Sequence, residues 1–271
     1  MYIDFHCHCN SDDPQAVAEF VRVYEENEVI GCLSGGLRYG AHDFVPNEET
    51  LAIAKKYPAQ LRALAKIDLW DSETDTSIIY RYADMGFSGF KFIYPYYEYD
   101  HDLYMPVYEA AEQTGLPVLF HTGNFRPSEA DVKYRRPVIR NMDPMTLDRI
   151  ARSFQKLNIV AAHLGTTFWR TQAAELTKVH KNLYCDLAGN GSWQMLSAEE
   201  IYGYFRSSYP ASGNNENFKK LVFGSDAYIS NVFPMLSGKE NYLMKLKRLG
   251  LPADIIDAVM GGTVAGWLGI R

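Results

Sequence analysis

Hydrophobic and polar positions along the chain alternate between two kinds of segment. Short runs rich in Val, Ile, Leu, Phe and Tyr are typical of strands buried on both faces. Eight such runs occur, at Tyr2–Cys7, Val29–Ser34, Leu61–Ile67, Gly89–Tyr94, Pro117–His121, Ile159–His163, Leu183–Leu187 and Leu221–Ser225. Apolar residues at helical spacing follow each run, in Gln15–Glu26, Asn47–Tyr57, Thr76–Met85, Tyr104–Gln113, Met145–Phe154, Thr171–His180, Ala198–Arg206 and Lys239–Leu249. The pattern predicts eight strand–helix units in strict order.

Residues that favour helix ends lie at these boundaries. Asp143-Pro144 supplies an N-cap and a proline at a helix start, and Gly86 and Gly115 stand where helices should stop. Eight such units predict an α/β fold, a (β/α)₈ TIM barrel that forms a single domain over residues 1–271, because these barrels take about 250 residues. A doubly wound sheet would usually carry a Gly-rich first turn, whereas the first turn here is His-Cys-His-Cys-Asn-Ser-Asp.

Composition narrows the range of partners. The net charge of −6 and the pI near 5.7 argue against nucleic acid, since phosphate binding requires a basic face. No apolar run approaches the roughly 20 residues that span a bilayer, so we expect no membrane partner. The N-terminus lacks the basic-then-apolar order of a signal peptide, and a cytoplasmic location is the expectation. The four cysteines match no zinc ribbon and are interpreted as reduced, small apolar residues.

Candidate chemistry lies at the C-terminal ends of the predicted strands, which is where barrel enzymes carry their active sites. The first run ends His6-Cys7-His8, and alternation along a strand places both imidazoles on one face, with Cys7 on the other. His121 and His163 end the fifth and sixth runs, and Asp226 directly follows the eighth. Two histidines alone could be hydrogen-bonded core residues, but buried polar groups are costly without partners. The recurrence of histidine and aspartate at the C-terminal ends of several predicted strands therefore favours a metal site.

The chain resembles the amidohydrolase superfamily, and specifically its amidohydrolase-2-like branch of metal-dependent hydrolases and decarboxylases. The resemblance covers essentially the whole chain. It rests on Asp-Phe-His-Cys-His, Pro-Val-Leu-Phe-His, Ala-His-Leu-Gly, Phe-Gly-Ser-Asp and the closing Gly-Gly-Thr-Val-Ala-Gly-Trp-Leu-Gly-Ile, in this order. Each piece is weak alone, and the combination is specific.

The resemblance implies a role for each of these residues. His6, His8, His121 and Asp226 would bind one divalent metal ion, zinc by preference, with manganese as the alternative. Asp226 and His163 would be the catalytic residues: Asp226 takes a proton from the attacking water, and His163 polarises a carbonyl group or holds that water.

Lys91 departs from part of the family, in which the fourth strand carries a glutamate or a carboxylated lysine. Alternation places Lys91 on the inward face with Gly89 and Ile93. It could form a carbamate that bridges two metals, or remain an ammonium that pairs with Asp226 or with bound substrate. The second interpretation is favoured, because this branch usually holds one ion.

The segment from Gly123 to Pro144 is too long for a routine strand–helix connection. Its cationic residues favour a small anionic, carboxylate-bearing substrate, with Arg126 as the first candidate for contact; ion pairs within a solvated loop are the alternative. They are Arg126, Lys133, Arg135, Arg136 and Arg140. Five tyrosines after the fourth run would line a pocket or, more often, pack the rim or a homodimer interface: Tyr94, Tyr96, Tyr97, Tyr99 and Tyr104.

We therefore expect a metal-dependent hydrolase that acts on a small carboxylated ester, lactone or amide through a metal-activated water. A non-oxidative decarboxylase, which is a lyase, would use the same metal site, and the ligand set does not separate the two. A metal-binding barrel without activity is disfavoured by His163 and Asp226, since a binding protein needs no proton-transfer groups.

Overall fold

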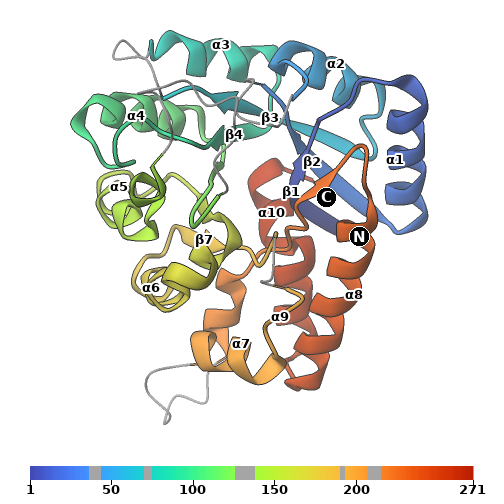
Figure 1. Cartoon of the computed structure of the whole chain (residues 1–271), viewed down its shortest axis with the longest axis vertical. Coiled ribbons are helices and arrows are strands. Elements are labelled where there is room, and N and C mark those ends of the chain that lie inside the picture. The colour runs from blue at the N-terminus through green and yellow to red at the C-terminus, as the bar shows by residue number, and fades with distance from the viewer. Residues whose placement is uncertain (37–43, 70–74, 126–137, 190–192, 207–214, 271) are drawn as a thin grey trace.

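The structure is a computed structural model that describes residues 1–36, 44–69, 75–125, 138–189, 193–206 and 215–270. These residues form an α/β barrel, with helices around a central parallel sheet (Figure 1). The prediction of a single-domain TIM barrel is confirmed. The strands are β1 (Tyr2–His8), β2 (Val29–Ser34), β3 (Leu61–Ile67), β4 (Gly89–Phe92), β5 (Val118–Phe120), β6 (Ile159–Ala161), β7 (Leu183–Cys185) and β8 (Ala227–Tyr228).

Helices follow the strands in the predicted alternation. The α-helices are α1 (Pro14–Glu26), α2 (Asn47–Lys56), α3 (Ser77–Met85), α4 (Met105–Thr114), α5 (Leu147–Ser153), α6 (Thr166–Val179), α7 (Ala198–Phe205), α8 (Phe233–Arg248), α9 (Ala253–Asp257) and α10 (Thr263–Leu268). Two of them begin earlier than predicted, α6 at Thr166 and α8 at Phe233. Among the described residues, no helix is long and apolar enough to cross a membrane.

The sheet runs in the order β7-β6-β5-β4-β3-β2-β1-β8, with parallel neighbours. It closes where Leu221 forms a parallel bridge with Cys185 of β7 and where the Phe5 N–H of β1 donates to the Phe223 carbonyl at 3.0 Å. The prediction of the eighth strand at Leu221–Ser225 is therefore wrong in its bounds. That segment lies in the strand's place and bonds to both neighbours, but the regular ladder with β1 begins at Ala227.

Strand β1 contains a bulge. Asp4 pairs with Gly31 and Cys7 pairs with Leu33, so β1 advances three residues while β2 advances two. One extra residue interrupts the alternation of faces. As a result Phe5 lies in the inner core of the barrel and His6 also points inward, while Cys7 packs in the outer core.

The core consists of two layers. Inside the barrel, apolar side chains of successive strands pack together, and Val264 and Trp267 of α10 cover one end: Ile3, Phe5, Ile30, Cys32, Leu64, Leu119, Val160, Ala162 and Val222. A larger layer lies between the sheet and the surrounding helices. The polar residues at the C-terminal ends of the strands are therefore held on a rigid, apolar support.

Candidate metal centre

The structure brings together four histidines and an aspartate from distant parts of the chain. His6 and His8 belong to β1, His121 follows β5, His163 follows β6, and Asp226 precedes β8. The four imidazoles are buried, and the Asp226 side chain is 23% exposed, so the group is reached from solvent at the carboxylate. All five therefore lie at the C-terminal mouth of the barrel.

Two of these residues have a left-handed backbone, His163 with φ 64° and Asp226 with φ 65°. Such a conformation costs about 1–3 kcal/mol for a residue other than glycine and is concentrated at functional sites. Hydrogen bonds from the backbone N–H groups of these two residues hold both turns. His163 N–H donates to the Asp186 side chain at Oδ1 (2.6 Å), and Asp226 N–H donates to the His6 carbonyl (2.7 Å).

Asp226 lies against the histidine pair of β1. Its Oδ1 is 2.8 Å from His8 Nε2 and 3.6 Å from His6 Nε2. Burial acts to raise the pKa of this carboxyl, but the hydrogen bond from the His8 side chain and the electrostatic effect of the surrounding histidines outweigh burial and hold the pKa well below its usual range. Asp226 is therefore an anion that faces two imidazoles.

Asp186, directly after β7, fixes two of the histidines. Its Oδ2 accepts from His6 Nδ1 at 2.9 Å, and its Oδ1 accepts from the backbone N–H groups of His163 and Ala188. Because Asp186 accepts the proton on His6 Nδ1, the lone pair of that imidazole is on Nε2, toward Asp226. The sequence analysis missed Asp186, although a carboxylate inside the apolar run Leu183–Leu187 is a visible signal.

Hydrogen bonds also fix which ring nitrogen carries the proton in the second imidazole pair, His163 and His121. The Ala188 carbonyl can only accept, so at 2.8 Å it requires the proton of His163 on Nδ1. His163 Nε2, 3.1 Å from His121 Nδ1, then accepts from that nitrogen. This leaves the lone pair of His121 on Nε2, a buried atom that has no hydrogen-bond partner in the described part of the chain. Burial also lowers the pKa of His121 and of His6, which keeps both imidazoles neutral.

This donor set fits a divalent metal ion. Neutral imidazole nitrogens and a carboxylate are the ligands that zinc and similar ions prefer, and an unsatisfied buried nitrogen is the mark of a missing partner. Two groups of side chains have candidate ligand atoms within 4.8 Å of one another: His6, His163 and Asp186, and His6, His8 and Asp226. These five residues could hold a metal. Asp186 already accepts three hydrogen bonds, so we assign it the role of orienting His6 and the turn that carries His163.

Lys91 points inward from β4, as expected. Its Nζ is 2.9 Å from His6 Nε2, and no carboxylate of the described residues forms an ion pair with it. The expected pairing with Asp226 is therefore not found as a direct contact, although Asp186 and Asp226 both act to raise the pKa of Lys91. Burial outweighs them and lowers that pKa to about 8.

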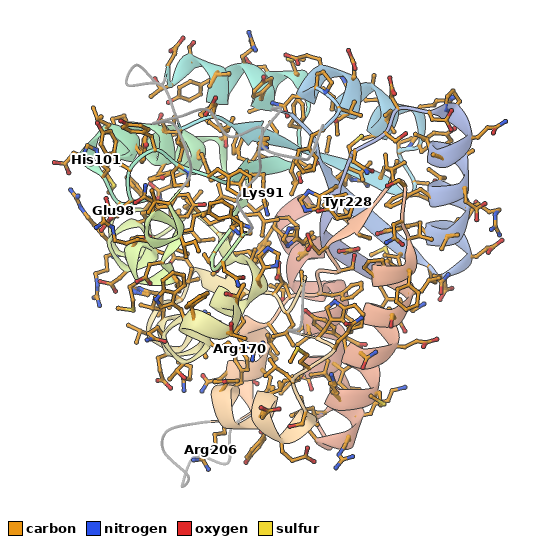
Figure 2. All side chains as sticks on the ribbon, in the orientation of Figure 1. Lys91, Glu98, His101, Arg170, Arg206 and Tyr228 are labelled. Atoms are coloured by element: carbon orange, nitrogen blue, oxygen red, sulfur yellow. The ribbon has the colours of Figure 1, made fainter. Side chains whose placement is uncertain are left out.

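Aromatic side chains surround the site. Tyr228 stacks on His8 with ring centroids 4.9 Å apart, Phe44 lies 5.4 Å from His8, and Tyr94 lies 5.8 Å from His121. Figure 2 shows Lys91 and Tyr228 near the centre of the molecule. These rings could face a flat or apolar part of a ligand.

The remaining predictions concern the loops. Arg126, Lys133, Arg135 and Arg136 lie outside the described residues. Arg140 is exposed and pairs with Glu98 at 3.1 Å, which fits the alternative of ion pairs at the surface. Of the tyrosines, Tyr99 and Tyr104 are buried in the core, whereas Tyr96 and Tyr97 are exposed.

The barrel and the histidine–carboxylate group at its mouth define an α/β barrel with a possible metal site. The chain belongs to the amidohydrolase-2 family, because the sequence profile of that family, described as amidohydrolase, matches residues 3–270. No curated protein matches the chain.

Solved structures show the same fold over the whole chain. An uncharacterized TIM-barrel protein from Bordetella bronchiseptica has 18% identity and a TM-score of 0.69, covering 99% of this chain and 98% of that one. The 5-carboxyvanillate decarboxylase LigW from Sphingomonas paucimobilis has 15% identity and a TM-score of 0.67, covering 100% and 99%. A probable 2-pyrone-4,6-dicarboxylic acid hydrolase from Acinetobacter baumannii, with citric acid bound, has 14% identity and a TM-score of 0.63, covering 99% of each.

Proposed function

We propose that this protein is a metal-dependent hydrolase that cleaves a small carboxylated ester, lactone or amide. One divalent ion, zinc or alternatively manganese, would be held by His6, His8, His121 and Asp226. The observation that carries this assignment is the buried Nε2 of His121, whose lone pair has no hydrogen-bond partner among the residues that the structure describes. His6 Nε2, which also has a lone pair, lies 3.6 Å from Asp226 Oδ1, and both residues are near enough to His121 to affect its pKa.

The ion would supply Lewis acidity, which polarises a carbonyl oxygen and lowers the pKa of water. Asp226 is the proton acceptor in this proposal, because it is the partly exposed carboxylate at the mouth and lies beside the two imidazoles of β1. His163 has its Nδ1 proton fixed by the Ala188 carbonyl, so its Nε2 is the atom that acts on substrate after exchanging its contact with His121. Such contacts commonly rearrange when substrate binds.

The proposal that the substrate carries a carboxylate is supported by the cationic residues proposed at the mouth of the barrel. Lys91 is a buried cation without an ion pair among the described residues, and a substrate anion would provide one. Arg126 remains the proposed contact from the loop after β5. Two of the similar structures are named, one as a probable and one as a putative, hydrolase of 2-pyrone-4,6-dicarboxylic acid, which is a lactone that carries carboxylates.

Decarboxylation is the second candidate. Three similar structures are named as decarboxylases, one of 5-carboxyvanillate and two of 2,6-dihydroxybenzoate. This reaction would use the same residues to bind a carboxylated ring and would protonate the carbon that loses carbon dioxide.

Isotope labelling separates the two reactions. The protein is loaded with zinc or manganese, its metal content is measured, and it is assayed in ¹⁸O water against carboxylated lactones, esters and aromatic acids. Incorporation of ¹⁸O into the product is expected for the hydrolase. Release of carbon dioxide without incorporation would assign the decarboxylase instead. Absence of bound metal would overturn both proposals, and two ions per chain would favour a carboxylated Lys91.

The role of His163 is tested by His163→Asn. We expect this variant to retain its metal and to lose turnover by about 10²-fold or more, as is typical when a proton-transfer group is removed. The matched control is His180→Asn, which removes a buried imidazole that pairs with Asp148 at 2.7 Å and lies between α6 and β7, at the N-terminal ends of the strands and not at the mouth. The control should keep its turnover. Turnover retained by the His163 variant would remove this residue from the mechanism.

A further inference from the structure

Ser34, the last residue of β2, places a buried hydroxyl beside one of the proposed metal ligands. It pairs in register with His8 of β1, so the two residues project from neighbouring strands at the mouth of the barrel. The Ser34 Oγ lies 3.1 Å from His8 Nδ1 and 3.2 Å from the Cys7 carbonyl oxygen, and the residue is 2% exposed. The hydroxyl therefore has two possible acceptors within reach and a single proton to donate.

The histidines beside His8 have partners of a different kind. His6 Nδ1 faces the Asp186 carboxylate, and the His163 Nδ1 proton goes to a backbone carbonyl. Carboxylates and carbonyls can only accept, so each of them fixes its imidazole in one tautomer. A serine hydroxyl can donate or accept. It therefore satisfies the nitrogen that faces it whether or not this nitrogen carries the proton.

The other nitrogen of His8 decides which of the two arrangements forms. Burial lowers the pKa of His8, so the imidazole is neutral and has one N–H. His8 Nε2 lies 2.8 Å from Asp226 Oδ1, and a carboxylate anion can only accept, so this contact places the proton on Nε2. Nδ1 then accepts from the hydroxyl of Ser34.

Coordination through Nε2 requires the opposite tautomer. A metal ion binds the lone pair of a neutral imidazole, so the proton of His8 must then be on Nδ1. In that tautomer Ser34 accepts from His8 Nδ1 and turns its own proton to the Cys7 carbonyl. Every group in this chain of contacts has a partner in both arrangements.

We infer that Ser34 is the positioning residue of His8: its hydroxyl keeps a hydrogen bond to Nδ1 in both tautomers, so that His8 can exchange its Nε2 proton for a metal ion without leaving a buried nitrogen unsatisfied. Protons balance in this exchange, because one leaves Nε2 and one is taken up at Nδ1. The inference rests on the proposed function. It adds the residue that orients the second ligand of β1.

Zinc titration of Ser34→Ala tests this inference. The variant lacks the hydroxyl and should bind zinc with a Kd at least about tenfold above that of the wild type, since the loss of such an outer partner typically weakens metal binding by 10- to 100-fold. Ser34→Thr keeps the hydroxyl and should bind zinc like the wild type. Ser34 lines a cavity of about 10 Å³, which is about the space of one water molecule and accommodates the added methyl group.

The matched control is Thr177→Ala. Thr177 is also buried, and its hydroxyl donates to the Ala174 carbonyl at 2.7 Å within α6. This variant loses a buried hydroxyl of the same kind, and its zinc Kd should equal that of the wild type. The Tm of each zinc-free variant shows that the protein is folded.

NMR of protein labelled with ¹⁵N-histidine reports the tautomer directly. The resonances of His8, assigned by their absence in His8→Asn, should show the proton on Nε2 in zinc-free protein and on Nδ1 in zinc-loaded protein. In the zinc-free form, Ser34→Ala should also move the resonance of the unprotonated Nδ1, because this nitrogen loses its hydrogen-bond donor. A hydroxyl that served only for packing would leave that resonance in place.

Three outcomes would overturn the inference: a zinc Kd of Ser34→Ala equal to that of the wild type, a proton on the same nitrogen of His8 with and without zinc, or a folded Ser34→Thr that binds zinc as weakly as Ser34→Ala. Equal zinc affinities of wild type and Ser34→Ala would remove this inference and leave the proposed function standing. Absence of zinc binding by the wild type would remove both.

Discussion

Gly189 lies between the two residues that we propose as catalytic. A Cβ added to it would come 2.6 Å from His163 Nδ1 and 2.9 Å from Asp226 Oδ2, and its backbone has φ 76°. Any side chain at this position would therefore push on both groups and would strain the backbone by about 1 kcal/mol. The approach of the bare backbone keeps His163 and Asp226 close to each other.

Gly189→Ala should reduce kcat/KM by at least tenfold, because His163 must leave its position against the Ala188 carbonyl. The measurement is kcat/KM with the substrate found by isotope labelling, together with Tm. Gly203→Ala is the matched control: nothing lies within 4 Å of its added Cβ, and Gly203 is inside α7, where alanine favours the helix by up to about 1 kcal/mol. Equal activity of the two variants would contradict the packing role of Gly189.

At the residue scale, the sequence predicted which histidines and which aspartate meet, because each of them directly ends an apolar run. It missed Asp186, because this residue lies inside an apolar run that was interpreted as a plain strand. A charged residue in such a run was the available signal. The pairing of Lys91 with His6 was not predictable, since it depends on which nitrogen of His6 bears the proton.

At the scale of elements, Asp4 joins three of them. Its carboxylate accepts from the His6 N–H at the bulge of β1, from Tyr24 Oη of α1, and from both the N–H and the hydroxyl of Ser225 before β8. Four donors therefore converge on one fully buried side chain. Asp4 holds the closing edge of the barrel against β1.

Asp4→Asn should destabilise the protein by about 3 kcal/mol, because an amide nitrogen would face donors that then lack an acceptor. Urea unfolding measures this loss. Tyr24→Phe is the comparison, since it removes one of the four hydrogen bonds and should cost about 1 kcal/mol. A loss for Asp4→Asn no larger than that for Tyr24→Phe would show that the carboxylate does not hold these elements together.

The order of the elements was predictable because each apolar run and each helical segment is a local signal. The position of β8 was not, since the regular pairing of Ala227 and Tyr228 with β1 depends on contacts made across the whole chain. The bulge in β1 was also hidden: Tyr2–His8 alternates in sequence as a regular strand would, and only the register against β2 reveals the extra residue.

At the scale of the whole molecule, the proposed metal ligands connect the first strand, the fifth strand and the segment before the last strand. An ion that binds this folded arrangement and not the unfolded chain stabilises the protein by mass action. Free zinc at 100 times Kd should contribute about 2.7 kcal/mol.

Removal of metal with EDTA should therefore lower Tm by roughly 5–10 °C for a domain of this size. Differential scanning calorimetry with and without added zinc measures the shift. The same titration on His121→Ala, which removes the unpartnered nitrogen, should show a smaller shift. An identical shift in both proteins would mean that zinc stabilises the chain from another location.

The additional residue in β1 allows one strand to supply both core residues and site residues to the interior of the barrel. Ile3 and Phe5 fill the interior of the barrel, and after the interruption His6 and His8 turn to the same interior at its open end. Apolar substitutions at Ile3 or Phe5 can thus change the stability of the inner core while His6 and His8 keep their direction. If the same residues formed a regular strand without the bulge, alternation would turn His6 and His8 away from the face of Ile3 and Phe5, and Cys7 would take their place at the entrance.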